Sequence, residues 1–534
     1  MKGGHGRRLM LYAGSSWARI VAGFAVSFIL TPMLIEELGV DLFGLLSLVA
    51  LTLALSDPIK AAVGKVLTRE LTQARAAEDR DRFRDVFSNG VVLAVLGAAI
   101  VMLIASVLAI VGPEVLRLAP ENVSRARVAL FIEGAMFASV LLLMPANNLY
   151  IATHRIVLEN VHRSLIRVLD LIAALIVFSV DFGDPFLSFV IGRAILRSAH
   201  GALKASWILL KEPWARFHSA MVSRTRMKDL AGIGAWSMGT QIARIGFVAC
   251  DQILLNMFFG LVYNGLYGVV NQLRSYARMF GGNIALGVDA VAADLDERGD
   301  DAKGRALLIA TMKMTLSVTL HCAILIGVFT PVILEVWLGD RLYGDENLLS
   351  VMTPGAARDL AWSFILILLP GIVLMETNRA ATENLYGMGH IRRYSPLLIW
   401  GAVIKIVLAT SWLMLGGGPL SLAWSSLLVN ALVYGIALPR LVCVLTTLTA
   451  RELIFGAYLR PLVASMFIAA AAVGMYQLFE DWDWTTLILS VGATCAVYAV
   501  TFPLIVTTAS ERASIWRMIA GIARRGKGRR ATKA

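Results

Sequence analysis

Charged residues are scarce in this chain. They make up 16% of its 534 residues, whereas soluble domains carry roughly 25%. Hydrophobic residues make up 58%, and the mean hydropathy is +0.72. Because the apolar excess extends over most of the length, the composition excludes a soluble enzyme with one membrane anchor and favours a polytopic membrane protein.

Several kinds of functional site are also missing. The four cysteines lie far apart in apolar runs, without Cys-x-x-Cys or Cys/His spacing, which argues against a zinc site or a disulfide framework. No G-x-x-x-x-G-K-[ST] motif occurs, so we expect no ATP-binding loop and no cofactor. The expected outer loops reach only about 20 residues, the length of connections in a compact bundle. We therefore expect a protein that is not an enzyme.

Apolar windows predict the membrane spans. A spanning helix needs about 20 mostly apolar residues, and about fourteen such windows can be drawn. They begin near Leu9, Phe43, Val86, Val128, Arg163, Pro185, Asp229, Leu261, Ala306, Asp359, Ser395, Pro419, Arg460 and Trp484. The long uncharged stretch between Lys405 and Arg440 is divided at Gly416–Pro419, because that sequence cannot continue a helix. The sequence predicts an all-α membrane protein with about fourteen helices.

The basic residues predict the orientation. With the N-terminus in the cytoplasm, the inner segments hold 32 Lys and Arg residues and the outer segments hold five. This asymmetry obeys the positive-inside rule and places both termini in the cytoplasm. The basic tail, residues 509–534, is expected to contact anionic membrane lipid rather than nucleic acid.

A short motif repeats in the two halves. Leu38–Leu45 and Phe259–Leu266 both follow the pattern Φ-G-x-x-x-x-G-L, where Φ is apolar, and each follows a predicted span with an arginine inside it. The repeat predicts two pseudo-symmetric lobes, as in two-lobed transporters. We expect an N-lobe at 1–210 with spans 1–6, a basic cytoplasmic connector at 211–228 and a C-lobe at 229–445 with spans 7–12. Spans 13–14 follow at 446–508.

These features resemble a known family. The Pro32…Leu38–Leu45 hairpin, its counterpart with Asp251-Gln252 and Gly265-Leu266-Tyr267, and Trp337-Leu338-Gly339 are similar to those of polysaccharide and O-antigen flippases of the MOP superfamily. That superfamily also contains multidrug exporters of the MATE type and lipid II flippases. The resemblance implies a MATE-like fold of two six-helix lobes plus a final helix pair. One departure is Asp57-Pro58-Ile59-Lys60, where many members have an uncharged segment of the Asp-Leu-Gly type.

Twelve cations lie within the predicted spans. A charge at the bilayer centre costs about 2.5–3.5 kcal/mol, so most of them must face an aqueous cavity, pair with acids or reach the interface. In the family, spans 1, 2, 7 and 8 line the central cavity. The resemblance therefore implies that five cations converge there and bind phosphate: Arg19, Lys60, Arg244, Arg274 and Arg278. Arginine suits a diphosphate because its planar fork makes two parallel hydrogen bonds.

The alternative for each cation is an ion pair. Arg244 is one heptad from Asp251, Arg379 lies between Glu376 and Glu383, and Asp57 is three residues from Lys60 beside a candidate hinge at Pro58. A basic face of the sixth span carries Arg193, Arg197, His200 and Lys204. Asp170 is placed to pair with Arg197, which favours a network inside the lobe.

The sequence thus predicts a flippase in the bacterial inner membrane. Its substrate would be a polyprenyl-diphosphate oligosaccharide for surface polysaccharide, moved by alternating access. Its partners would be the lipid-linked glycan and membrane lipids, with the polysaccharide polymerase and export machinery as candidate protein partners. A cation-coupled MATE-type exporter, a lipid II flippase and a non-transporting scaffold are the alternatives. A membrane glycosyltransferase, polymerase or ligase is disfavoured because no large loop could carry its active site.

Overall fold

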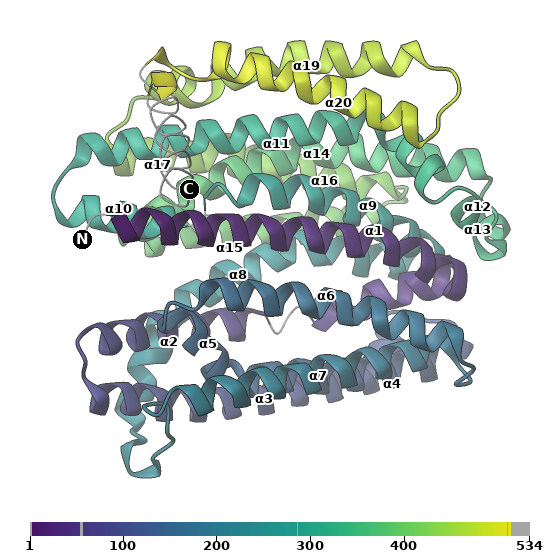
Figure 1. Ribbon diagram of the computed structural model, residues 1–534. Coiled ribbons are helices and arrows are strands. Elements are labelled where there is room, and N and C mark those ends of the chain that lie inside the picture. Colours follow the sequence, from purple (N-terminus) through teal and green to yellow (C-terminus); the bar gives the residue numbers. More distant parts are fainter. Residues whose placement is uncertain (1–2, 54–56, 286, 510, 514–534) are drawn as a thin grey trace, which may run out of the picture. The chain divides into compact units, whose positions relative to one another are not determined.

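The computed structural model describes residues 3–53, 57–285, 287–509 and 511–513, and all regular structure in these ranges is helical (Figure 1). The helices of the first half are α1 Gly3–Leu53, α2 Asp57–Ala76, α3 Arg80–Val115, α4 Pro120–Leu142, α5 Met144–Ala152, α6 Ile156–Ser179, α7 Pro185–Lys211, α8 Arg224–Phe259 and α9 Leu261–Gly282. The others are α10 Val288–Glu297, α11 Asp301–Trp337, α12 Asp340–Tyr343, α13 Glu346–Val351, α14 Pro354–Gly387, α15 Ile391–Met414, α16 Leu420–Asn430, α17 Leu438–Thr446, α18 Ala450–Leu453, α19 Leu459–Leu478 and α20 Trp484–Thr501. Short 3-10 and π-helical segments lie at Ser219–Met221, Ala431–Ala437, Ile454–Tyr458 and Phe502–Val506.

The helices have the length and composition of membrane spans. In the described part of the chain, nine are long and apolar enough to cross a membrane, or ten if the bent pair α4–α5 forms one span. The polytopic all-α class is therefore confirmed, and the count of fourteen stays a prediction. Helices α6 and α7 are also long, with 24 and 27 residues, but both carry several charged side chains.

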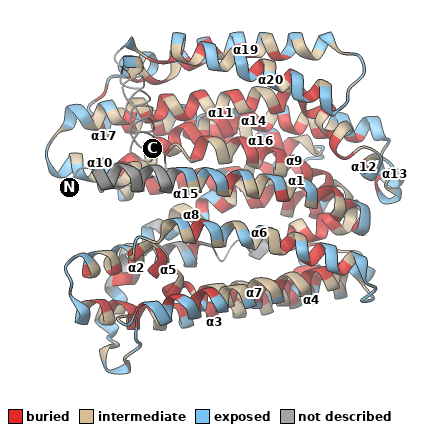
Figure 2. Cartoon of the chain, viewed as in Figure 1, coloured by how far each residue is buried: buried red, intermediate tan, exposed pale blue. Residues whose placement is uncertain are grey.

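Helix α19 has an apolar outer face. Helix α19 buries only a narrow stripe, Pro461, Ala464, Ile468 and Ala472, and its remaining surface is largely exposed (Figure 2). Met466 and Phe467 on that surface are 70% and 55% exposed. Side chains of this kind are stable only against lipid or another apolar partner.

The contacts divide the chain into two compact units. Unit 1 contains Met1–Gln272, Trp337–Phe364 and Ile391–Val429, and unit 2 contains Leu273–Val336, Ile365–His390 and Asn430–Ala534. The lobes expected at 1–210 and 229–445, and the places of the connector and of the last two spans, stay predictions.

Helix ends follow the sequence signals. Helix α15 ends at Met414 and α16 begins at Leu420, which confirms the break at Gly416–Pro419. Gly416 there has a φ of +87°, a conformation that favours glycine. The Asp184 side chain caps α7 by accepting a hydrogen bond from the Leu187 backbone N–H, with Pro185 next.

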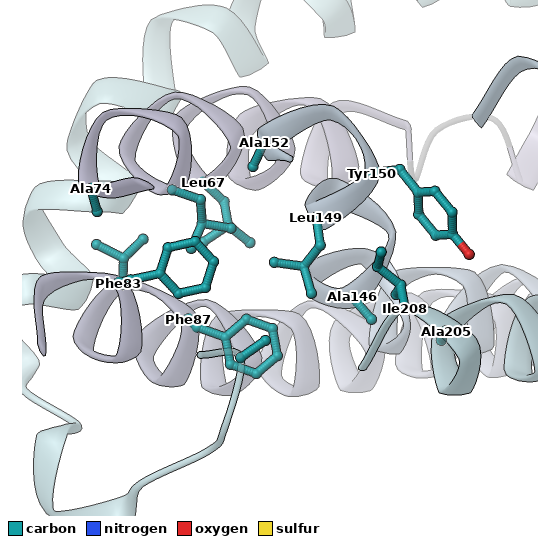
Figure 3. Close-up of a cluster of buried hydrophobic side chains, with 13 residues drawn as sticks. Leu67, Ala74, Phe83, Phe87, Ala146, Leu149, Tyr150, Ala152, Ala205 and Ile208 are labelled. Atoms are coloured by element: carbon teal, nitrogen blue, oxygen red, sulfur yellow. The ribbon is translucent and has the colours of Figure 1, made fainter. Parts of the chain in front are cut away.

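An apolar cluster in unit 1 joins α2, α3, α5 and α7 (Figure 3). It includes Leu67, Phe83, Leu149, Tyr150 and Ile208, all at most 1% exposed. The cluster holds Tyr150 of α5 against α7, where its hydroxyl donates to the Lys204 carbonyl over 2.9 Å. It thereby fixes the part of α7 that carries the basic side chains.

Candidate functional site: a basic cluster in unit 1

Helix α1 lies alongside α6 and brings Arg19 to its charged face. The Asn160 amide donates to the hydroxyls of Ser15 and Ser16 over 2.9 and 3.1 Å. These hydrogen bonds fix the position of α1 along α6. Arg19, one turn further along α1, is within electrostatic range of Glu159, Arg163 and Arg167. Its Nε is buried and has no hydrogen-bond partner among the described residues.

Helix α7 adds a second cation to the same carboxylate. Lys204 Nζ lies 2.6 Å from Glu159 Oε2, a close ion pair in which Oε2 lacks a well-aligned hydrogen bond. Arg163 Nε donates to Glu159 Oε1 over 2.8 Å. Lys60 on α2 is exposed but within electrostatic range of Lys204. Glu159 is therefore close to Arg19, Arg163 and Lys204. Arg167 is near Arg19 and Lys60 is near Lys204, so these five cations form one basic cluster.

Two histidines join this basic cluster. The rings of His162 and His200 have centroids 5.2 Å apart. His162 Nδ1 and His200 Nε2 are buried and have no hydrogen-bond partner among the described residues. The cluster thus combines several cations with the single carboxylate of Glu159 and has a net positive charge, which is the electrostatic character of an anion site.

Sequence reasoning found only part of this cluster. It selected Arg19, Lys60, His200 and Lys204 and did not select Glu159, Arg163 or Arg167 of α6. The available signal was the spacing of Glu159, Arg163, Arg167 and Asp170, which lines up charges along one face of a helix.

Other basic side chains of α7 are paired. Arg197 makes two hydrogen bonds to the Asp170 carboxylate, one of them 2.6 Å from Nε to Oδ1, which is the pairing that the sequence suggests. Arg193 pairs with Glu133 of α4. Because Asp170 and Glu133 are buried, these two arginines neutralise acids inside unit 1 rather than adding to the anion site.

The suggested pairing of Arg244 with Asp251 is wrong. Arg244 is exposed and its Nε donates to Gln241 over 2.8 Å, whereas Asp251 is fully buried and pairs with Lys405 at 3.0 Å. Seven residues span about 10.5 Å along a helix, which is a long reach for one side chain, and Lys405 of α15 lies closer.

The remaining candidate residues have different places. Arg274 is buried and Arg278 is half-buried on the part of α9 that belongs to unit 2, and both contact other residues. The side chain of Asp57 lies outside the described residues, so its pairing with Lys60 is untested. The convergence of the five predicted phosphate ligands in one cavity stays a prediction. No group of three or more His, Cys, Asp or Glu suited to a metal occurs in the described ranges.

Comparisons with known proteins agree with this architecture. No family profile matches the chain. It is 23% identical over 497 residues to the uncharacterized membrane protein EpsK of Bacillus subtilis (strain 168), covering 90% of this chain and 92% of EpsK. The lipid II flippase MurJ in an inward closed conformation superposes with a TM-score of 0.67, 11% identity, and coverage of 93% and 98%. An inward-facing MATE transporter of the MOP superfamily gives 0.62 with 12% identity, and coverage of 82% and 100%.

At these identities the comparisons define the fold. The chain is a multi-span membrane protein with the fold of the MOP superfamily.

Proposed function

We infer that this chain is a flippase for a lipid-linked oligosaccharide in the bacterial inner membrane, with both termini in the cytoplasm. The observation that carries the proposal is the basic cluster of unit 1, in which Arg19, Arg163 and Lys204 interact with Glu159 and two more cations lie near them. Arg19 Nε is a buried donor without a hydrogen-bond partner among the described residues, and a diphosphate would supply an anionic oxygen for it. The fold shared with the lipid II flippase MurJ supports a transporter of this kind, and the sequence similarity to the membrane protein EpsK extends over most of the chain.

The charge of the headgroup also provides a driving force. In this proposal the lobes alternate between inward-open and outward-open states, the headgroup crosses through the protein and the lipid tail stays in the bilayer. An inside-negative membrane potential drives negative charge outward. Moving two net negative charges out across about 100 mV is favourable by about 4.6 kcal/mol. The membrane potential is therefore sufficient to drive the movement. The polysaccharide polymerase and export machinery would take the product.

The main alternative is a cation-coupled exporter of the MATE type. A site for organic cations needs an excess of acids, and the cluster around Arg19 has the opposite sign. An uptake assay in vesicles separates the two functions, because only the exporter would expel a cationic dye in exchange for protons or sodium. Accumulation of lipid II in depleted cells would instead indicate the lipid II flippase.

Export by arginine variants tests the proposal. Arg19→Ala and Arg274→Ala are expected to reduce surface polysaccharide per folded transporter at least about tenfold, because a hydrogen bond to a charged group contributes about 1.5–3 kcal/mol. Arg19→Lys should keep part of the activity, since it retains the charge without the fork. Arg298→Ala is the control, because Arg298 is 70% exposed and, among the described residues, its recorded ion pair is with Asp294 of α10. Normal export by both alanine variants, or loss only in proportion to protein level, would refute the phosphate site.

A further inference from the structure

A second charged site lies in unit 1, and the flippase proposal does not use it. The side chains of Asp251 on α8 and Lys405 on α15 are both 0% exposed, and Lys405 Nζ lies 3.0 Å from Asp251 Oδ2. Lys405 Nζ also donates to the backbone carbonyl of Phe247, one helical turn before Asp251. In the described part of the chain, two oxygens of α8 thus hold the ammonium, with the Cys250 thiol of the same helix beside them.

Neighbouring helices complete the site. The Tyr267 hydroxyl of α9 donates to Asp251 Oδ2 over 3.1 Å, and the Ser426 hydroxyl of α16 donates to the same atom over 3.1 Å. Each hydroxyl keeps lone pairs that can turn toward a cation. A carbonyl and a carboxylate oxygen thus contact the ammonium, and two hydroxyls bind the same carboxylate. Oxygens of these kinds are the donors that hard cations prefer.

A buried ion pair needs a reason other than stability. The desolvation of two charges often exceeds their attraction, so an apolar pair of similar volume is commonly as stable. A tethered ammonium has the charge of a monovalent metal ion and cannot dissociate. Its presence in an oxygen-lined site explains why the charge is kept.

We propose that the Phe247 carbonyl, the Asp251 carboxylate and the Ser426 hydroxyl form a monovalent-cation site that the Lys405 ammonium occupies permanently. The wild-type protein then binds no free sodium or potassium at this place. A consequence for transport follows if the chain is the flippase inferred above. The transport cycle then requires no alkali cation at this site and takes its energy from the membrane potential. Removal of the ammonium turns the same oxygens into a site for a free cation.

The test measures thermal unfolding of the purified full-length protein in detergent. Each variant is compared in choline chloride, sodium chloride, potassium chloride and methylammonium chloride at equal ionic strength. The wild-type midpoint should be the same in all four salts. The Lys405→Ala midpoint should be lower in choline and rise by a few degrees with at least one small cation, because a ligand that binds only the folded state stabilises it.

Two further variants make the result decisive. In Asp251→Asn/Lys405→Met both charges are removed, so this protein should fold and its midpoint should not respond to the cation. Lys405→Gln keeps most of the side-chain volume without the charge and should respond like Lys405→Ala, but less strongly. A folded Lys405→Ala protein with one midpoint in all salts would overturn the proposal. A wild-type midpoint that rises with the cation as much as that of Lys405→Ala would also overturn it. The same holds if Lys405→Ala and Lys405→Gln both fail to fold in every salt while the double variant folds.

A separate experiment measures transport. Polysaccharide export by wild-type vesicles under an imposed potential should be equal in choline and sodium media. If export required sodium while the midpoints were as expected, transport would not be independent of alkali cations. The assignment of the Lys405 ammonium to a cation site would still hold. Absence of export in every medium would refute the flippase function and leave the midpoint result standing.

Discussion

Gly44 and Gly265 lie against each other, although 221 positions separate them in the chain. A Cβ on Gly44 would be 2.7 Å from the Gly265 backbone nitrogen, and a Cβ on Gly265 would be 2.1 Å from the Val40 carbonyl oxygen. The Asn264 amide also donates to the Gly44 carbonyl over 3.2 Å. The two copies of the repeated motif therefore pack backbone to backbone within unit 1, and both glycines are required by the close approach.

Gly265→Ala is expected to push α9 away from α1 at this contact. The nearest obstructing atom is the Val40 backbone carbonyl oxygen, which cannot rotate away, so we expect a loss of about 1–3 kcal/mol, as for other overpacked sites. The measurement is the thermal midpoint of the purified protein. Gly23→Ala in α1 is the matched control, because a Cβ there meets nothing within 4 Å. Equal midpoints for the two variants would show that the turns do not need this contact.

Glu159→Gln is expected to destabilise unit 1 strongly. The change leaves Lys204, a buried cation, without its carboxylate, and breaking one side of a buried pair costs about 3–5 kcal/mol. The amount of monodisperse protein and its thermal midpoint should both fall. Asp81→Asn provides the comparison, since Asp81 is 84% exposed and 3.9 Å from Arg84. Asp81→Asn should change the stability by no more than about 0.5 kcal/mol. If Glu159→Gln had an equally small effect, the Glu159–Lys204 pair would not stabilise unit 1.

The sequence predicts contacts that lie within one helix or follow from helix depth. The Arg379 triad is set by helical spacing, and Arg197 with Asp170 follows from the matching depth of two neighbouring spans. The Asp251–Lys405 pair was missed because its members are 154 residues apart and meet only when α15 packs on α8. The role of Glu159 was missed for the same reason, since its cations come from several helices.

Asp184 should make stability depend on pH on the acidic side. Partial burial favours its neutral form, but the Leu187 backbone N–H and the Arg125 guanidinium outweigh burial and hold its pKa below the usual value. The stabilisation is therefore fully present above about pH 4 and is lost as the pH falls through the lowered pKa.

Asp184→Ala is the variant that tests this dependence. It should cost about 1 kcal/mol at pH 7, as for other N-caps, and its difference from wild type should shrink near pH 3. Thermal midpoints at both pH values check this. Asp359→Ala, at a side chain that is 71% exposed, should cost little at either pH. If the difference in midpoint between Asp184→Ala and the wild type grew at low pH, the lowered pKa of Asp184 would be wrong.

Cysteine labelling is expected to confirm the orientation. Ser350, Asp481 and Ala76 are all exposed, so a cysteine at any of them can react once reagent reaches its side of the membrane. In a background without the four native cysteines, Ser350→Cys and Asp481→Cys should react with an impermeant maleimide on intact cells. Ala76→Cys should react only after permeabilisation. The reverse pattern would invert the topology that the basic residues predict.

Arg379 is expected to support folding rather than transport. Its guanidinium lies 3.4 Å from Glu376 and 3.9 Å from Glu383, and Glu376 is only 2% exposed. Arg379→Ala removes a charge partner of a buried acid, which should cost about 1–3 kcal/mol and lower the amount of folded protein. Export per folded molecule should stay near the wild-type value, unlike that of Arg19→Ala.

Gly282→Ala perturbs the same group without removing it. A Cβ at Gly282 would lie 2.6 Å from Arg379 Nη1 and 3.1 Å from Glu376 Oε2, so the guanidinium must shift away from its acid. We expect the same direction of change as for Arg379→Ala but a smaller loss, because the end of a long side chain can move. Gly304→Ala, with nothing within 4 Å of its Cβ, should be neutral or stabilising. Normal abundance of Arg379→Ala with export lost per folded molecule would instead place Arg379 in the transport site.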